Sequence, residues 1–105
     1  YPKQTDANAA LQSNQIDAYM ADSPVADYAV KQTGGAFQVA GTASGVAPYG
    51  IAVPKNAGTL KDALQAAITK LMANGTYKQI LDHWGVTSGA ISQSKINDSA
   101  DTNPS

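Results

Sequence analysis

Residues 16–24, with the sequence IDAYMADSP, hold the side chain best placed to do chemistry, the carboxylate of Asp22. The apolar run before it predicts a short buried strand over 16–20, and Ser23-Pro24 predicts the start of a helix. In open α/β sheets, ligands bind beyond the carboxyl ends of the strands. A carboxylate there accepts charge-assisted hydrogen bonds from a cationic ligand group. The alternative is that Asp22 only helps to start the helix, and the local pattern leaves both interpretations open.

The elements that must position Asp22 alternate between helix and strand. Periodicity predicts helices over 6–13, from Ser23-Pro24 to Gly34-Gly35, over 59–73 and over 77–84, and strands over 16–20, 36–40 and 49–53. Thr5, Ser23 and Thr59 are the expected N-caps. Residues 41–48, rich in Gly, Ala, Ser and Thr, form a connector. The predicted fold class is therefore α/β, with the apolar stripe of the 59–73 helix, which includes Leu64 and Ile68, in the core.

Composition narrows the classes of function. The chain has 105 residues, the size of one domain, with 43% hydrophobic residues and a net charge of −1. This charge gives no electrostatic case for a nucleic-acid or anionic-membrane partner. No stretch reaches the length of a membrane span, and no signal segment opens the chain. All seven basic residues are Lys. Because two-point capture of a carboxylate is normally done by Arg, a clamp of that kind would lie outside these residues.

Catalytic and cofactor motifs are not found in the sequence. His83 is the only histidine, and it falls off the apolar stripe of its helix, so we expect it to be exposed. One His without Cys makes a zinc site improbable. Neither a Gly-x-Ser-x-Gly elbow nor a phosphate-binding glycine loop is present. We therefore expect no cofactor, no metal and no catalysis.

Three motifs in order carry a family resemblance. Residues 11–28 read LQSNQIDAYMADSPVADY, residues 49–55 read YGIAVPK, and Leu60 is followed by NGTYKQI at 74–80 and Trp84-Gly85. Together they resemble the second-lobe signature, the strand returning to the first lobe and the closing helices of the bacterial extracellular solute-binding proteins of family 3. These are the polar amino-acid receptors of ABC importers. Asn14 departs from the pattern, since the family usually has Gly there.

The resemblance implies a two-lobed, type II periplasmic-binding-protein-like fold, of which this chain spans part of both lobes. Residues 1–43 would be a second-lobe segment and 44–49 the hinge crossing. Residues 50–85 would be the C-terminal part of the first lobe, and 86–105 an extended, partly disordered tail. The first-lobe binding residues, a carboxylate-binding Arg and the signal segment would all precede Tyr1. The protein would be periplasmic or extracellular, with a membrane permease as partner.

By the same resemblance, Asp22 matches the acidic residue that binds the α-ammonium group of a free amino acid. Ser23 could also reach the ligand, although helix capping is the simpler role for it. Binding across the cleft would favour the closed form, because the ligand touches both lobes only when the hinge shuts.

Two other functions fit the same scaffold. One is an amino-acid-sensing domain of a receptor or kinase, and the other is a dehydratase or lyase, which would need an acid or base besides Asp22. The resemblance also predicts an apolar surface on this chain that the rest of a two-lobed protein would cover. Apolar side chains around Leu64, Ile68 and the strands would then be exposed and favour dimerisation, strand exchange or pairing with the N-terminal half of the protein.

Overall fold

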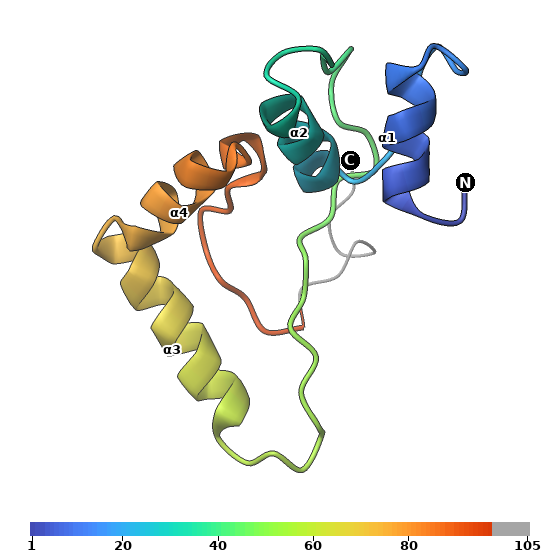
Figure 1. Cartoon of the computed structure of the whole chain (residues 1–105). Coiled ribbons are helices and arrows are strands. Elements are labelled where there is room, and N and C mark those ends of the chain that lie inside the picture. The colour runs from blue at the N-terminus through green and yellow to red at the C-terminus, as the bar shows by residue number, and fades with distance from the viewer. Residues whose placement is uncertain (98–105) are drawn as a thin grey trace.

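The computed structural model describes residues 1–97 and contains four α-helices in this range. They are α1 (Gln4–Gln12), α2 (Ser23–Gln32), α3 (Leu60–Ala73) and α4 (Thr76–Trp84), followed by a short 3-10 helix, η1 (Thr87–Gly89) (Figure 1). Residues 98–105 of the expected tail over 86–105 lie outside the described residues.

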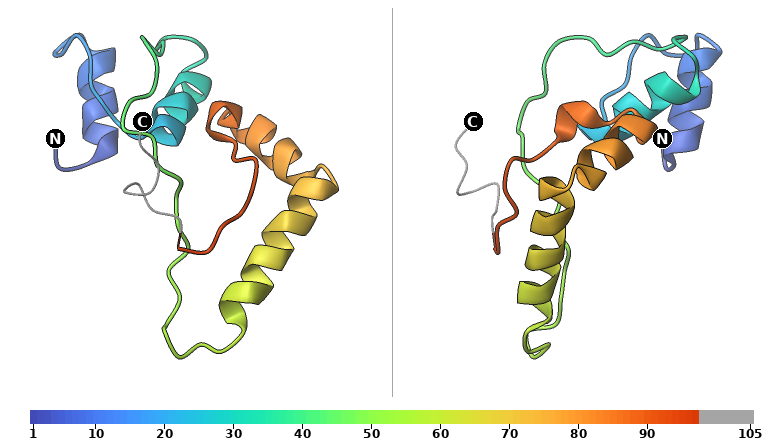
Figure 2. Two further views of the ribbon diagram at one scale, coloured as in Figure 1. Left: turned by 180° about the vertical axis from the view of Figure 1, so that it is seen from behind. Right: turned by 90° about the vertical axis from the view of Figure 1, so that its left-hand side faces the viewer.

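The helices form an open arrangement rather than a closed core. A long non-helical link leads from the end of α2 to the start of α3, and the chain then returns through α4 to α2 (Figures 1 and 2). The molecule measures 49 × 28 × 25 Å, with a radius of gyration of 16.5 Å. A compact domain of 100 residues has a radius of gyration of about 13 Å. The chain therefore lacks the compactness of a self-contained globular domain.

All four predicted helices are confirmed, but two of the three expected N-caps are wrong. Lys3 is the N-cap of α1, so Thr5 lies inside the helix, and Asp22 rather than Ser23 is the N-cap of α2. Thr59 is the N-cap of α3, as expected, but its side chain makes no capping hydrogen bond. The helices therefore owe their starts to backbone geometry and to Pro24 in the first turn of α2.

The predicted strands over 16–20, 36–40 and 49–53 do not form within the described residues. These segments are present as irregular or extended chain, so of the α/β class expected from the sequence the structure shows the helices alone. The reason is that a strand, unlike a helix, cannot satisfy its backbone hydrogen bonds within its own segment. The expected tail over 86–105 is also not extended throughout, because η1 lies in it.

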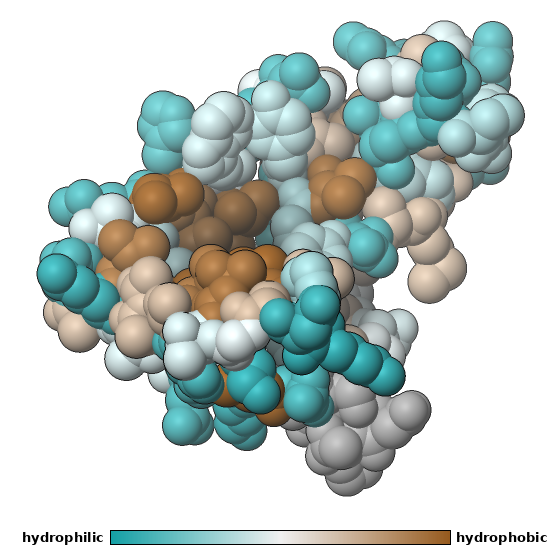
Figure 3. All heavy atoms as spheres, turned by 90° about the horizontal axis from the view of Figure 1, so that it is seen from below, coloured by the Kyte–Doolittle hydropathy of each residue, from teal (hydrophilic) through white to brown (hydrophobic). Residues whose placement is uncertain are grey.

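The core expected on α3 is wrong for this structure. The buried apolar residues are Ala7, Ala10, Ala29 and Phe37, all outside α3, while Leu64 and Ile68 are half-buried. Figure 3 shows apolar side chains gathered openly on one face of the molecule. The accessible surface is 8166 Å², against about 5,500 Å² for a folded monomer of this mass. Apolar surface is thus left uncovered, as the sequence predicts.

Gly85 fixes the end of α4. Its φ is +71°, in the left-handed region, and a Cβ built there would lie 2.8 Å from Cδ and 3.1 Å from Cβ of Lys31 in α2. The glycine therefore permits both the turn and the close approach of the Lys31 stem.

Substituting Gly85→Ala is expected to destabilise the contact between α2 and α4 by about 1–2 kcal/mol, because alanine resists the left-handed conformation. The midpoint of thermal unfolding, followed by far-UV circular dichroism, should fall by several degrees. Gly50→Ala is the matched control, since Gly50 has no positive φ and a Cβ there meets nothing within 4 Å. Equal midpoints for the two variants would contradict this account of Gly85.

Candidate functional site

Asp22 is the N-cap residue of α2, and its side chain is exposed. Its backbone carbonyl accepts hydrogen bonds from the N–H groups of Val25 and Ala26, both at 3.0 Å. Its side chain makes no capping hydrogen bond to the helix. The backbone of Asp22 therefore starts the helix, while the carboxylate is left for another partner. A negative charge at this end is also stabilised by the helix dipole.

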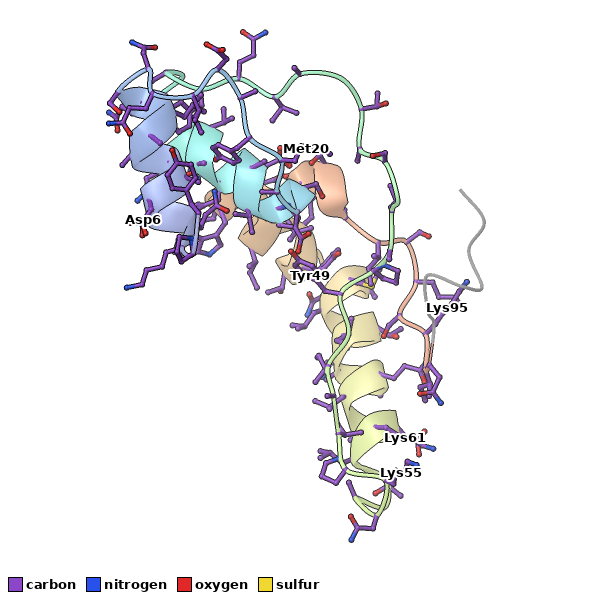
Figure 4. All side chains as sticks on the ribbon, turned by 90° about the vertical axis from the view of Figure 1, so that its right-hand side faces the viewer. Asp6, Met20, Tyr49, Lys55, Lys61 and Lys95 are labelled. Atoms are coloured by element: carbon purple, nitrogen blue, oxygen red, sulfur yellow. The ribbon has the colours of Figure 1, made fainter. Side chains whose placement is uncertain are left out.

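That partner in the structure is Tyr49. The phenolic O–H of Tyr49 donates a hydrogen bond to Oδ2 of Asp22 over 3.0 Å. Tyr49 lies on the extended link where it runs past α2 toward α3 (Figure 4). The hydrogen bond to Asp22 raises the pKa of Tyr49 above 10.0, with smaller contributions from desolvation and from the negative charge of Asp22. Both side chains are exposed, so the pair is open to a ligand.

Sequence reasoning missed the part that Tyr49 plays beside Asp22. An aromatic residue that opens a predicted strand gives no local indication of a hydrogen-bond partner 27 residues away. The position of Tyr49 within a segment matching a receptor motif was the one available signal.

Ser23, the second predicted site residue, is exposed at the first position of α2. Its Oγ lies 3.9 Å from the position of a Cβ built on Gly89, and Cγ of Pro24 lies 3.8 Å from the same position. The start of α2 therefore faces η1. Ser23 follows Asp22 directly in the chain, and its ligand role stays a prediction.

Contacts from the C-terminal end of α4 and from η1 hold α2 in place. Ser88, in η1, donates a hydrogen bond to Asp27. The rings of Tyr28 and Trp84 pack with centroids 5.8 Å apart at an angle of 59°. With the Lys31 stem over Gly85, these contacts fix the helix whose N-terminus carries Asp22.

Asp82 anchors η1 to α4. Its carboxylate accepts hydrogen bonds from Nζ of Lys78 at 2.6 Å and from Oγ1 of Thr87 at 2.7 Å. The hydrogen bond from Lys78 lowers the pKa of Asp82 below 3.8, and the bond from Thr87 acts in the same direction. Desolvation opposes this shift, and the charge of Lys78 adds to it.

Because the folded pKa of Asp82 is lowered, its stabilising contribution is complete above pH 3.8 and is lost as the pH falls further, through the folded value. Far-UV circular dichroism between about pH 5 and about pH 2 should show an acid step in the total helical signal as this contribution is lost. Asp82→Asn should remove this step and leave the changes due to other carboxylates. An identical acid profile in the variant would contradict the role of Asp82.

The other chemical candidates give no second site. His83 is exposed, as predicted, and packs edge-on to Trp84 with ring centroids 5.1 Å apart. Among residues 1–97 there is no cluster of three His, Cys, Asp or Glu side chains that could hold a metal ion. In the same range, no helix is both long and apolar enough to cross a membrane.

Two hollows in the described part of the chain are lined by residues other than Asp22. One, of about 220 Å³, is lined by residues between Val53 and Lys61 together with Asn97. The other, of about 510 Å³, lies between α1 and the C-terminal end of α2. The structure therefore shows Asp22 on an open surface, so that any enclosed ligand site would need walls from elsewhere.

Comparison with curated proteins finds two informative relatives. The chain is 34% identical over 98 residues to the arginine-binding protein ArgT of Corynebacterium glutamicum, a match that covers 93% of this chain and 32% of the relative. It is 32% identical over 79 residues to GlnH of Bacillus subtilis, an ABC transporter glutamine-binding protein, covering 75% of this chain and 29% of the relative.

The chain thus spans about a third of the length of these relatives. No family model matches the chain, and no solved structure matches it significantly. Both relatives are named as amino-acid-binding proteins, and the match to ArgT covers 93% of this chain. The chain is therefore a relative of the family 3 solute-binding proteins of bacterial ABC importers.

Proposed function

We propose that this chain is part of the substrate-binding component of an ABC importer, which captures a polar amino acid between two lobes. In this proposal residues 1–43 belong to the second lobe, 44–49 to the hinge crossing and 50–85 to the first lobe. Three motifs in the family order and two amino-acid-binding relatives support it. The open, poorly buried structure also supports it, because such a chain needs further polypeptide to cover its apolar side chains.

The observation that carries the proposal is the exposed Asp22 carboxylate, which makes no capping hydrogen bond to α2. It stands at a helix N-terminus and shares only Oδ2 with Tyr49. A carboxylate has about four acceptor positions, so Asp22 can still accept N–H donors from an α-ammonium group. An ammonium offers three such donors and neutralises the negative charge. Ser23, beside it, is proposed as a secondary contact.

The opposite end of the ligand needs another group. The chain has no Arg among its seven basic residues, so the planar two-point clamp suited to an α-carboxylate would come from the rest of a full-length protein. Arginine and glutamine, the ligands in the relatives' names, share the α-ammonium and α-carboxylate groups and differ in their side chains. We therefore propose recognition of the α-amino-acid group and leave the preferred side chain to experiment.

The proposal places the protein in the periplasm or outside the cell, with a membrane permease as partner and no catalytic step. The names of the two relatives denote binding proteins, not a kinase, a dehydratase or a lyase. Binding for import is accordingly the function supported over sensing or catalysis.

A thermal-shift screen of the full-length protein against the common amino acids tests this function. At least one polar amino acid should raise the unfolding midpoint, because a ligand that binds only the folded state stabilises it. The isolated 105-residue chain should bind weakly or not at all, since it supplies one side of the site. A screen in which no amino acid stabilises the full-length protein would overturn the proposal.

A further inference from the structure

We propose that Tyr49 is a positioning residue for the Asp22 carboxylate, holding it from the segment assigned to the hinge crossing. The inference rests on the proposed function and deepens it, because the family resemblance gives Tyr49 no part in the ligand site. It assigns Tyr49 to the site through Asp22 and not through direct contact with the ligand.

The rotation of the Asp22 carboxylate is limited from two sides. The backbone of Asp22 is fixed by the hydrogen bonds of its carbonyl with the N–H groups of Val25 and Ala26. Rotation about the two side-chain bonds of Asp22 remains, and the bond from Tyr49 to Oδ2 restricts both. Asp22 is thereby held at its backbone by α2 and at its carboxylate by Tyr49.

The Asp22 carboxylate keeps acceptor positions that a ligand can use. Tyr49 donates one hydrogen to Oδ2, and among residues 1–97 no hydrogen bond ends on Oδ1. Oδ1 and the second lone pair of Oδ2 are then free to accept from an ammonium group. Tyr49 therefore orients the acceptor without competing for all of it, and less conformational entropy is lost when the ligand binds.

Tyr49 comes from a segment of the chain that is distant in sequence from Asp22. It is 27 residues from Asp22, and it follows the glycine-rich connector that leaves α2. Its side chain is 68% exposed, so packing contributes little to its position and the hydrogen bond is its main tie to α2. A movement of the connector would therefore change the orientation of the ligand-binding carboxylate.

Calorimetry with the amino acid that binds the full-length protein best tests this role. Tyr49→Phe keeps the ring and removes the donor, and should weaken binding about threefold to tenfold, the effect of one hydrogen bond. Tyr1→Phe is the matched control, because Tyr1 is also 68% exposed and its phenol makes no hydrogen bond with any of residues 1–97. It should bind as the unsubstituted protein does.

The double variant separates positioning from direct ligand contact. If Tyr49 acts through Asp22, adding Tyr49→Phe to Asp22→Asn should cause little further loss, so that the two effects are far from additive. Additive losses would overturn the positioning role and indicate a direct contact. If Asp22→Asn loses binding while Tyr49→Phe binds normally, this inference fails and the proposed function stands. If no amino acid binds, the proposed function fails and this inference with it.

A spectroscopic readout tests the contact in the 105-residue chain itself. Tyrosine absorbance is followed during alkaline titration of the chain and of its Tyr49→Phe variant. Subtracting the two titration curves isolates the ionisation of Tyr49 from that of the other four tyrosines. Its phenol should ionise above pH 10.0, because Asp22 holds the proton in place. Asp22→Asn should move that ionisation to lower pH. An unchanged titration of Tyr49 in Asp22→Asn would overturn the inference.

Discussion

Substituting Asp22→Asn in the full-length protein is expected to weaken amino-acid binding by two orders of magnitude or more. Asparagine has nearly the same shape and keeps an oxygen that can accept from Tyr49, so the change removes mainly the negative charge. Leaving one charge of an enclosed pair without its partner costs about 3–5 kcal/mol, and each 1.4 kcal/mol is about tenfold in affinity. Isothermal titration calorimetry measures the loss.

Asp6→Asn provides the charge-matched control. Asp6 is exposed in the first turn of α1, and Figure 4 shows it on a different part of the molecule from Tyr49. This variant should bind within about twofold of the unsubstituted protein, as expected of a surface change away from the site. If Asp22→Asn folds normally and binds as tightly as Asp6→Asn, Asp22 is not the ammonium-binding residue.

The second large effect concerns association of the 105-residue chain. Met20 is 94% exposed and Ile51 is 64% exposed. The accessible surface of the chain exceeds that of a compact monomer of the same mass. This excess is larger than the area that a standard interface buries, which is about 1,600 Å². The chain alone should therefore self-associate, by dimerisation or strand exchange, and its mass from light scattering should rise with concentration.

Ile51→Asp should lower this association, because it places a charge on an extended segment whose backbone groups are free to pair. Asn56→Asp adds the same charge at an exposed polar position of the following turn and is the control. A chain that stays monomeric at all concentrations and unfolds cooperatively would contradict the expectation, since it would show that the uncovered apolar side chains need no partner.

The helices were predictable from sequence because their causes are local. Pro24, Gly75 and Gly85 mark helix ends through their own backbone preferences. The apolar stripe of α3 was equally visible, but its burial was not, because burial depends on what packs against it. Leu64 and Ile68 are half-buried in this structure, and no residue of α3 is fully buried.

The strands could not be predicted correctly from local pattern. The alternation at 49–53 is typical of a strand, yet a strand needs a neighbour to complete its hydrogen bonds, and none is placed beside it among the described residues. The same holds for 16–20 and 36–40. If the proposed two-lobed fold is right, their neighbours lie in the part of the relatives that this chain does not span.

For the site, the sequence predicted the residue but not its partner. Asp22 was identified from its position after an apolar run, and the structure adds that its carboxylate does not cap α2. The hydrogen bond from Tyr49 depends on the path of a long connector, which no local pattern specifies. The ligand role of Asp22 and of Ser23 stays a prediction.

The central claim is that the protein recognises the α-ammonium group of an amino acid. The most direct measurement is a calorimetric titration of the full-length protein with its best amino acid and with the same compound lacking the α-amino group. The account predicts saturable one-site binding of the amino acid and a loss of at least a hundredfold in affinity for the deaminated compound. Equal affinity for the two compounds, or no binding of any amino acid, would contradict it.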